Sequence, residues 1–345
     1  MKQLQQTIAA CAAFMLVLCA ELAIGLLSAQ EAAQLFEASQ SLMGTQVRIL
    51  AYADDRERFD QATRAAFDRI AELDSILSDY RSDSEVMRLC ATAPHNEPVA
   101  VSDDLFEVLR LSQQISEASG GAFDVTVGNL SRLWRRARRQ RARPPADLLE
   151  AARATVDYRQ IELDEHNRRV KLTRPGVRID FGGIAKGYAA EQALRVLERH
   201  GLKSALIDAG GDLVIGEPPP GEPGWKVAIA ALERDQLPTE RFHAARCAIA
   251  TSGDLWQYIQ IEGRRYSHLL DPRTGWGVEG PRSATVVARN GAVADALATA
   301  VSVLPPEQGL RLVEQFHAVM LYMYREGDHV RSVRSPGFPH LPATR

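Results

Sequence analysis

The order of the expected secondary-structure elements is the feature that most constrains how this chain can fold. Segments with strand character mostly follow one another along the sequence, and helical segments interrupt them irregularly. A β-hairpin is expected at 160–163 and 169–172, with further strands at 47–51, 177–180, 204–208, 212–216, 225–230, 256–261 and 283–288. Helices are expected at 57–79, 103–119, 183–200 and 293–303, and in a stretch that passes Trp134. This order predicts an α+β fold, with largely antiparallel sheets flanked by helices in a single large domain.

The N-terminal segment predicts an exported protein. Residues 7–27 are almost entirely apolar, and Lys2 precedes them. This pattern is typical of a secretory signal peptide, although about 20 apolar residues can also remain as a membrane anchor, and Cys19 leaves a lipoprotein as a third reading. We therefore expect 1–29 to be a signal peptide or membrane anchor and 30–345 to be the folded domain. The expected location is the periplasm, with the chain free, anchored in the inner membrane or lipidated.

Charge and cysteine content exclude two classes of protein. Forty-one Lys and Arg against 44 Asp and Glu give a net charge of −3, whereas a nucleic-acid-binding protein usually carries a basic excess. No nucleic-acid partner is expected. Four cysteines among 345 residues are too few for a disulfide scaffold. Without the leader, Cys90 and Cys247 remain, either as a disulfide or as two buried thiols.

The segment at 178–188, RIDFGGIAKGY, combines features suited to a phosphate group. An expected strand delivers Asp180, two glycines form a tight turn, and a helix then begins with Lys186 in its first turn. Glycines allow the backbone to approach a ligand closely, a helix start offers free N–H groups, and a lysine supplies a point charge. A Gly-Gly turn beside a solvated lysine would have the same sequence pattern. This segment alone therefore does not decide between a phosphate-binding site and a turn without a ligand.

A second segment, ADALAT at 294–299, carries oxygen donors with helical spacing. Asp295 and Thr299 lie four residues apart, so their side chains share one face of a helix. A carboxylate and a hydroxyl near backbone carbonyls suit Mg²⁺ rather than zinc. The alternative is that Asp295 caps the helix and Thr299 bonds to its own backbone in the core.

Three more segments present side chains with possible roles in binding or catalysis. His268 comes just before the turn-forming DPRTG sequence and could orient or deprotonate a hydroxyl. Phe123 and Asp124 follow a loop of small residues, where an aromatic ring could stack on a ligand or pack in the core. Tyr80 follows the first long expected helix, and Met43 lies upstream of it.

Together these segments resemble one family, the FAD:protein FMN transferases, or ApbE family. The resemblance runs from about 43 to 316, with its blocks in the family's order. They are MGT at 43–45, the S-x-Y…SE segment at 78–85, GAFD-x-T-x-G at 121–128, D-x-GGIAKGYA at 180–189, AGGD at 209–212, ATSGD at 250–254, YSH-x-x-DPRTG at 266–275 and ADALATA at 294–300. Each block alone is weakly specific, but GGIAKG with a downstream ADALAT is highly specific.

The resemblance implies a fold, an activity and partners. Members have an ApbE-type, T-fold-like α+β fold, bind FAD with Mg²⁺ and transfer FMN to a Thr or Ser hydroxyl of an acceptor protein. The product is a phosphodiester, and AMP leaves. The implied acceptor is a flavoprotein subunit of a membrane redox complex, such as the sodium-pumping NADH:quinone reductase and its relatives (Nqr/Rnf-like complexes).

The resemblance also implies roles for individual residues. The positions that match FAD contacts are Met43, Tyr80, Ala122, Phe123, Asp124, Asp180, Lys186 and Leu269. The positions that match metal ligands are Gly183 and Ala298, through backbone carbonyls, and Asp295 and Thr299. Catalytic roles are expected for His268, Lys186 and Asp180.

The stretch Arg132–Arg143 has a feature that the family pattern does not require. It holds seven arginines, at 132, 135, 136, 138, 139, 141 and 143. They could form a solvated helix face, or a docking patch for an acidic acceptor or for anionic lipid at a membrane surface.

Three functions remain open at this point. The first is the transferase. The second is an Mg²⁺-dependent FAD pyrophosphatase, in which water replaces the acceptor hydroxyl and FMN and AMP are released. The third is a non-catalytic FAD carrier, against which the Asp295 and Thr299 pair argues, because a carrier needs no metal at the pyrophosphate.

Overall fold

A computed structural model describes residues 33–232, 238, 240–255, 257–261 and 263–339. The predicted leader at 1–29 lies outside these residues. Within the described part of the chain, no helix is both long and apolar enough to cross a membrane. Cys90 and Cys247 are both free thiols, so of the two alternatives for this pair the structure has the unbridged one.

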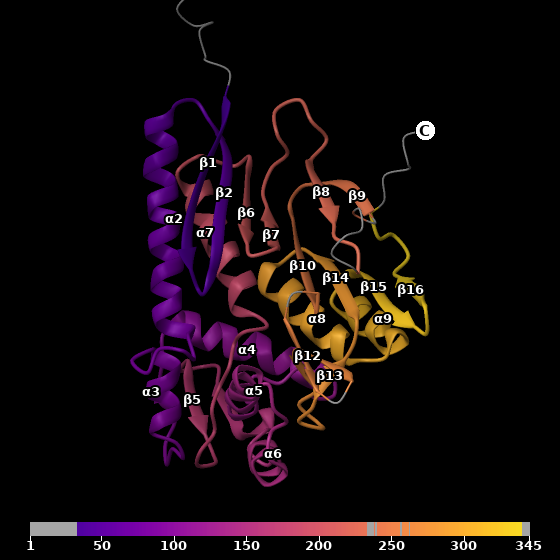
Figure 1. Cartoon of the computed structure of the whole chain (residues 1–345). Helices are drawn as coiled ribbons and strands as arrows, with labels where there is room; N and C mark the ends of the chain where they lie inside the picture. Colours follow the sequence, from indigo (N-terminus) through magenta and orange to yellow (C-terminus); the bar gives the residue numbers. More distant parts are fainter. Residues whose placement is uncertain (1–32, 233–237, 239, 256, 262, 340–345) are drawn as a thin grey trace, which may run out of the picture.

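An eight-stranded sheet forms the centre of the molecule, and every neighbouring pair of its strands is antiparallel. In spatial order its strands are β1 (Gln34–Leu42), β2 (Thr45–Ala53), β6 (Ala205–Ala209), β7 (Asp212–Ile215), β10 (Cys247–Gly253), β14 (Arg282–Ala288), β15 (Val319–Glu326) and β16 (His329–Arg334). Strands from both ends of the chain therefore form one sheet (Figure 1).

The described part of the chain also forms three smaller sheets. The first contains β11 (Tyr258–Ile261), β12 (Arg264–Leu270) and β13 (Gly277–Glu279), and the second contains β3 (Val99–Ala100), β5 (Arg169–Leu172) and β4 (Ile161–Asp164). The third is a pair, β8 (Trp225–Ile229) and β9 (Glu240–Ala244). The predicted hairpin at 160–172 is the β4–β5 pair.

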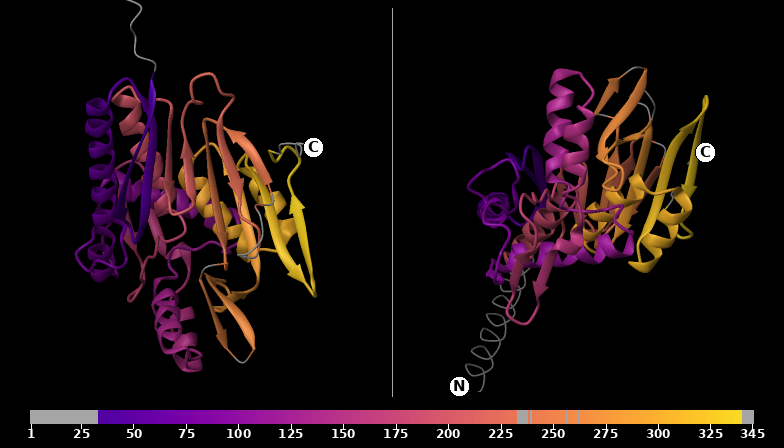
Figure 2. Two further views of the ribbon diagram at one scale, coloured as in Figure 1. Left: turned by 45° about the horizontal axis from the view of Figure 1, so that its top comes forward. Right: turned by 90° about the horizontal axis from the view of Figure 1, so that it is seen from below.

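Helices cover one face of the central sheet, as the two views of Figure 2 show. They include α2 (Arg56–Leu77), α7 (Ala185–Arg199) and α8 (Gly291–Val303), which pack in that order, and α9 (Pro306–Gln315) against α8. The other helices are α3 (Glu85–Ala91), α4 (Asp103–Ala118), α5 (Gly128–Gln140), α6 (Ala146–Arg153) and the short 3₁₀ helix η1 (Tyr158–Gln160).

Strand periodicity separates the two faces of the central sheet. On β2, Val47, Ile49 and Ala51 enter the core shared with the helices, while Leu50 packs in the opposite cluster with the β8–β9 pair. The helix side of β6, β10 and β14 is rich in alanine: Ala205, Ala209, Ala248, Ala250, Ala284 and Ala288. These small side chains let the helices lie close to the strands.

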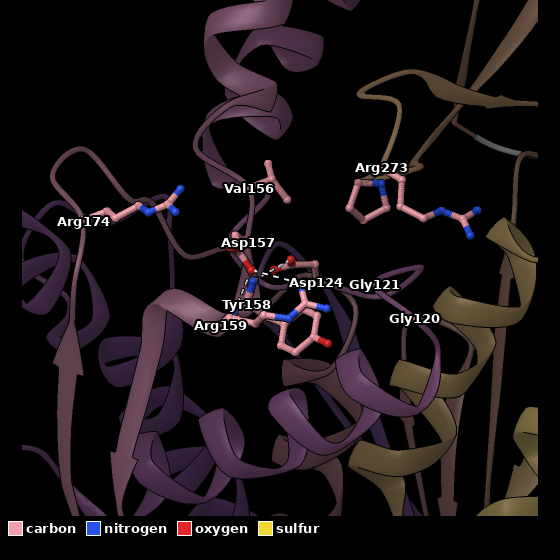
Figure 3. A pocket seen from close by; sticks show the side chains of 10 residues that line it. Gly120, Gly121, Asp124, Val156, Asp157, Tyr158, Arg159, Arg174 and Arg273 are labelled. Atoms are coloured by element: carbon pink, nitrogen blue, oxygen red, sulfur yellow. Dashed lines mark hydrogen bonds and ion pairs between the residues drawn. The ribbon is translucent and has the colours of Figure 1, made fainter.

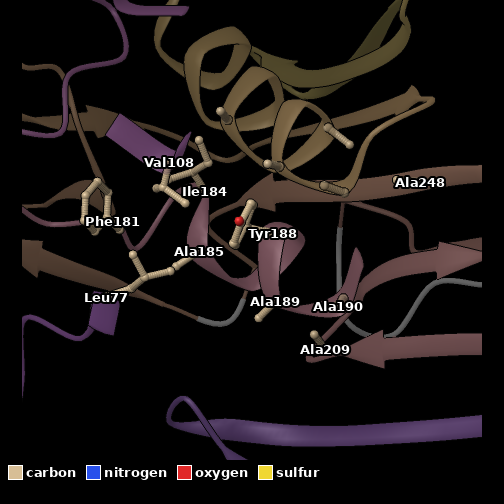
Figure 4. Close-up of a cluster of buried hydrophobic side chains, with 14 of the residues drawn as sticks. Leu77, Val108, Phe181, Ile184, Ala185, Tyr188, Ala189, Ala190, Ala209 and Ala248 are labelled. Carbon is tan, nitrogen blue, oxygen red and sulfur yellow. The ribbon is translucent and has the colours of Figure 1, made fainter. Parts of the chain in front are cut away.

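Two glycines bring α7 and α8 into backbone contact. A Cβ added to Gly187 would lie 2.1 Å from the carbonyl oxygen of Gly291, and one added to Gly291 would lie 2.3 Å from that of Gly187. Figure 4 shows the same part of α7, with Ala189 and Ala190 near Ala209 of the sheet. Only glycine permits this approach, which sets the first turn of α7 beside α8.

The structure confirms the predicted α+β fold with antiparallel sheets in one domain. The expected strand at 177–180 is wrong. This segment is extended but makes only one parallel bridge, between Val127 and Arg178. The N–H of Gly128 donates to the Arg178 carbonyl at 3.0 Å, and the N–H of Asp180 donates to the Val125 carbonyl at 2.8 Å. The segment at 177–180, in which apolar and polar residues alternate, thus pairs with the segment at 125–128 rather than with a strand of a sheet.

Candidate active site

A cleft of about 750 Å³ opens beside the start of α7. Its walls come from the β1–β2 turn, the end of α2, the loop at 122–127, α5, the turn before α7, the ends of β10 and β12, and α8. Twelve of the predicted site residues line it: Met43, Tyr80, Ala122, Phe123, Asp124, Asp180, Gly183, Lys186, His268, Leu269, Asp295 and Thr299. Residues that are up to 256 positions apart in the sequence, from Met43 to Thr299, therefore meet in one place.

Ala298 is the one predicted site residue that does not line the cleft. It is fully buried within α8, and its carbonyl oxygen accepts the hydroxyl of Ser302 at 2.9 Å. Ala298 thus directly precedes Thr299 on α8 without forming part of the cleft wall, and its role as a backbone ligand stays a prediction.

Lys186 lies between two buried carboxylates at the base of the cleft. Its ammonium forms a close ion pair with Asp212 and lies 3.6 Å from Asp295 Oδ2. Burial raises the pKa of Asp295 to about 6, while Lys186 acts against this rise. Burial alone would lower the pKa of Lys186, but the two carboxylates together raise it, so this lysine stays charged. Two carboxylates against one ammonium leave this part of the cleft with an excess negative charge.

The donors beside Lys186 fit a hard cation. The N–H of Gly187 donates to Asp295 Oδ2 at 3.1 Å, which fixes the carboxylate, and Asp295 Oδ1 accepts no hydrogen bond from the described residues. A Cβ added to Gly183 would lie 2.7 Å from Thr299 Oγ1, so the glycine backbone and the hydroxyl are adjacent. Carboxylate, hydroxyl and carbonyl oxygens are the donors that Mg²⁺ prefers.

The described residues contain no group of three or more His, Cys, Asp or Glu side chains that could hold a metal. A metal here would therefore depend on backbone and hydroxyl oxygens in addition to carboxylate. The mixed donor set at Gly183, Asp295 and Thr299 is of this kind.

The start of α7 offers fewer free N–H groups than the sequence indicates. The N–H of Gly182 donates to Asp180 Oδ1 at 2.8 Å, and those of Ile184 and Ala185 donate to the Phe181 carbonyl. The N–H of Gly187 is taken by Asp295. The tight turn and Asp295 thus already bind four of the N–H groups at the start of this helix.

Asp124 and Phe123 lie at the wall of the cleft but are themselves buried. Asp124 Oδ1 accepts the N–H and the hydroxyl of Thr126 at 2.8 and 2.7 Å, and Oδ2 accepts the N–H of Tyr158 at 2.9 Å. Phe123 belongs to the main hydrophobic core. Asp124 thus ties the small-residue loop to η1, and Phe123 anchors that loop.

Arg135 joins two further carboxylates at the other side of the cleft. Its guanidinium lies 2.6 Å from Asp79 Oδ2 and 2.8 Å from Asp180 Oδ2, and both carboxylates are almost fully buried. Burial and the neighbouring Asp180 raise the pKa of Asp79, and Arg135 opposes this rise. The same guanidinium lies 4.1 Å from the ring centre of Tyr80, which is 78% exposed at the rim.

His268 lies at the end of β12 with one ring nitrogen occupied. Its Nδ1 is 3.1 Å from the Gln257 carbonyl oxygen, which can only accept a hydrogen bond, so Nδ1 carries the proton and Nε2 keeps its lone pair. Burial, with smaller effects of Arg138 and Lys186, lowers the pKa of His268 to about 4. The imidazole is therefore neutral at pH 7 and able to accept a proton.

A second hollow of about 300 Å³ shares Asp124 and Pro272 with the cleft (Figure 3). Two of the arginines that line it are already paired: Arg273 with Asp271 at 2.9 Å and Arg159 with Asp157 at 3.4 Å. Its positive charge is largely compensated.

Comparison with solved structures defines the class of protein. The fold is similar to that of the flavin transferase ApbE from Vibrio cholerae, with a TM-score of 0.79, 28% identity and coverage of 88% of this chain and 97% of the other. The apo form of the Pseudomonas stutzeri flavinyl transferase ApbE matches with a TM-score of 0.77, 30% identity and coverage of 88% and 95%. The fold is thus that of flavin transferases.

The chain belongs to the ApbE family, because residues 43–323 match the model of that family. Among curated relatives, the FAD:protein FMN transferase of Escherichia coli (strain K12) is 30% identical over 281 residues, which cover 77% of each chain. That of Klebsiella pneumoniae (strain 342) is 29% identical over 309 residues, which cover 86% of each chain.

The sequence did not indicate several residues of the cleft as site residues. Asp212, Asp79, Arg135, Arg138 and Gln257 all line it. Asp212 belongs to the AGGD block at 209–212, and this motif could have indicated it as a site residue. Arg135 and Arg138 lie within the arginine-rich stretch, where the alternatives were solvent or a docking patch; both are half-buried in the cleft, while the other five arginines are exposed.

Proposed function

We propose that this protein is an FAD:protein FMN transferase that uses Mg²⁺. The observation that carries the proposal is the group formed by Lys186, Asp212 and Asp295 beside the Thr299 hydroxyl, in a cleft of the ApbE fold. This group combines a fixed cation for a phosphate with oxygen donors for a metal. Membership of a family whose curated relatives are named for this activity supports it.

The charge of the cleft supports the requirement for a divalent cation. Six carboxylates line it, those of Asp74, Asp79, Asp124, Asp180, Asp212 and Asp295, against the four cations of Arg81, Arg135, Arg138 and Lys186. A dianionic pyrophosphate would be repelled by this excess of negative charge. A bound Mg²⁺ would cancel this excess and neutralise charge on the phosphates, and Gly183, Asp295 and Thr299 would hold it.

The chain's own residues would then position the reaction. Lys186 holds a phosphate oxygen. Asp180 Oδ1 accepts the N–H of Gly182 and so keeps the turn before α7 in place. The acceptor hydroxyl oxygen forms a bond to the phosphorus of the FMN half, the bond from that phosphorus to the bridging oxygen breaks, and AMP leaves with that oxygen. The hydroxyl proton passes to Nε2 of His268. Positioning and electrostatics supply most of the catalysis in such transfers.

The partners and location follow as proposals. The acceptor would be a flavin-carrying subunit of a membrane redox complex of the Nqr/Rnf type, modified on a Thr or Ser. The leader-like segment at 1–29 would direct the protein to the periplasm, free or attached to the inner membrane. The exposed arginines of 132–143 would contact the acceptor, with anionic lipid at the membrane surface as the other candidate partner.

The proposal is tested by the intact mass of a candidate acceptor domain after incubation with residues 30–345, FAD and Mg²⁺. We expect a mass gain of one FMN that is lost without Mg²⁺ and falls at least about 100-fold in rate in Asp295→Ala, since a metal ligand is removed. Asp68→Ala, which removes an exposed carboxylate on α2, is the matched control and should retain the full rate.

Other outcomes would select other functions. FMN and AMP released without a mass gain would favour the pyrophosphatase, and FAD left intact would favour the carrier. A His268→Ala variant that keeps the full transfer rate across the pH range would remove His268 from its proposed role as base.

A further inference from the structure

Arg138 is a cation in the cleft that lacks an acidic partner. Its only hydrogen bond to a described residue runs from NH1 to the amide oxygen of Gln257, at 3.3 Å. A guanidinium has five N–H donors, so most of its donor capacity is unused. Burial lowers the pKa of Arg138, and the neighbouring Arg135 and Arg139 add to this effect.

The other cations of the cleft differ from Arg138 in this respect. Lys186 is paired with Asp212 and lies near Asp295. Arg135 is paired with Asp79 and Asp180, and Arg81 pairs with Asp83 at 3.2 Å. Arg138 alone among the four lining cations has no carboxylate within ion-pair distance in the described part of the chain. Its charge is therefore left for a ligand.

Arg138 is held in place by the helix that carries it. Trp134, one turn earlier on α5, is buried, donates its indole N–H to the Gly275 carbonyl at 2.8 Å, and packs against the rings of Tyr266 and Trp276. This anchor fixes α5 against the loop after β12. Arg138 thus projects into the cleft from a rigid element rather than from a mobile loop.

Its position is next to the proposed base. The residue that binds Arg138 through its side chain, Gln257, binds His268 through its carbonyl at 3.1 Å. Arg138 and His268 are therefore held by the same residue. A phosphate bound beside His268 would therefore lie close to this guanidinium.

We propose that Arg138, oriented by Gln257, forms a second anion subsite in the cleft that binds a phosphate of the substrate pyrophosphate. This inference rests on the proposed function, in that it takes FAD as the substrate. Lys186 and the oxygen donors near it would bind one part of the diphosphate, and Arg138 would bind the part next to His268. A planar guanidinium can hold two phosphate oxygens through a fixed pair of N–H donors, whereas a lysine acts as a point charge without that geometry.

The test is FAD affinity measured by flavin fluorescence with Mg²⁺ and without acceptor, at times too short for FAD to be cleaved, because the negative charge of the cleft would oppose binding without the cation. We expect Arg138→Gln to weaken FAD binding on the order of 10-fold, as the loss of a charge-assisted contact implies. Riboflavin, which has the same ring system but no phosphate, should bind to this variant as it does to the unaltered protein. Arg138→Lys should recover only part of the affinity for FAD.

Arg139→Gln is the matched control, because it removes the same charge from the next, exposed residue of α5. It should change FAD affinity less than twofold. Unaltered FAD affinity in Arg138→Gln would overturn the inference, as would an equal loss of FAD and riboflavin affinity, which would indicate a packing role. Failure of the unaltered protein itself to bind FAD would instead contradict the proposed function.

Discussion

His268 shows at the scale of a single residue how burial changes the protonation of a side chain. Its Nδ1 is tied to the Gln257 carbonyl, and burial lowers its pKa to about 4, well below the ordinary value of 6.5. A neutral imidazole with a free Nε2 can accept a proton from a hydroxyl at neutral pH. The same shift makes the stability of the fold depend on pH.

We expect the free energy of unfolding to fall as pH decreases from about 6.5 toward 4. In this window the imidazole of the unfolded chain binds a proton while that of the folded chain does not, so protonation favours unfolding. His268→Asn should remove this contribution, and the variant should lose less stability than the unaltered protein between pH 7.5 and 5. Urea unfolding at the two pH values measures the difference.

His166→Asn, in the exposed turn between β4 and β5, controls for the loss of an imidazole as such. If the unaltered protein and His268→Asn lost the same stability over this range, His268 would not be held neutral by the fold.

Site residues could be predicted from the sequence where a short motif places them close together. The spacing of Asp295 and Thr299 and the glycines around Lys186 indicate neighbouring oxygen donors, and the structure places them in one cleft. Their roles as ligands remain predictions. Arg138 could not be assigned to the cleft from sequence, because a run of arginines does not reveal which of them faces inward.

At the scale of elements, the crossing of α7 and α8 builds the site. Gly187 and Gly291 let the two backbones touch, and the N–H of Gly187 reaches the Asp295 carboxylate at 3.1 Å. One contact thus joins the start of α7 to the helix that carries Asp295 and Thr299.

Gly187→Ala should destabilise the protein by about 2–3 kcal/mol, the upper part of the usual range for an overpacked core. The added methyl group would lie 2.1 Å from the Gly291 carbonyl oxygen, so the helices must separate. The free energy of unfolding in urea measures the effect. Glu198→Ala, at an exposed position of α7, should change stability by less than about 0.5 kcal/mol, and similar values for the two variants would show that the contact is not tight.

Elements with a long amphipathic pattern were predicted closely. The helices expected at 57–79 and 103–119 are α2 (Arg56–Leu77) and α4 (Asp103–Ala118). β1 (Gln34–Leu42) gives no such signal, because most of its side chains are exposed on both faces. The segment at 177–180 resembles a strand locally, but pairing depends on a partner that the local sequence does not show.

At the scale of the whole molecule, α5 presents two different arginine faces. Arg135 and Arg138 line the cleft, while Arg132, Arg136 and Arg139 are exposed and make no ion pair with a described residue. The exposed three lie at positions i, i+4 and i+7, on one side of the helix. This unpaired positive face lies on the same helix as the two arginines that line the cleft, and it is the surface that we propose for acceptor docking.

Charge reversal of Arg132, Arg136 and Arg139 to Glu should raise the KM for an acidic acceptor on the order of 10-fold, because complementary charge steers association. FAD affinity should change less than twofold. Steady-state transfer at low salt measures the effect, which should shrink as salt screens the charges.

The matched control reverses Arg64, Arg199 and Arg311, which are exposed on α2, α7 and α9 away from the cleft. An equal rise in KM with this control would mean that net charge, not this face, is responsible. Unchanged transfer with loss of binding to anionic vesicles would assign the face to a membrane surface instead.

The balance of products in a single turnover tests most directly the central claim, that the cleft moves FMN from FAD to a protein hydroxyl. FAD and Mg²⁺ would be incubated with the protein and with excess acceptor domain, and AMP, free FMN and acceptor-bound FMN would be quantified. We expect one AMP for each flavin attached, with no free FMN. AMP matched by free FMN, with the acceptor unmodified, would contradict the claim.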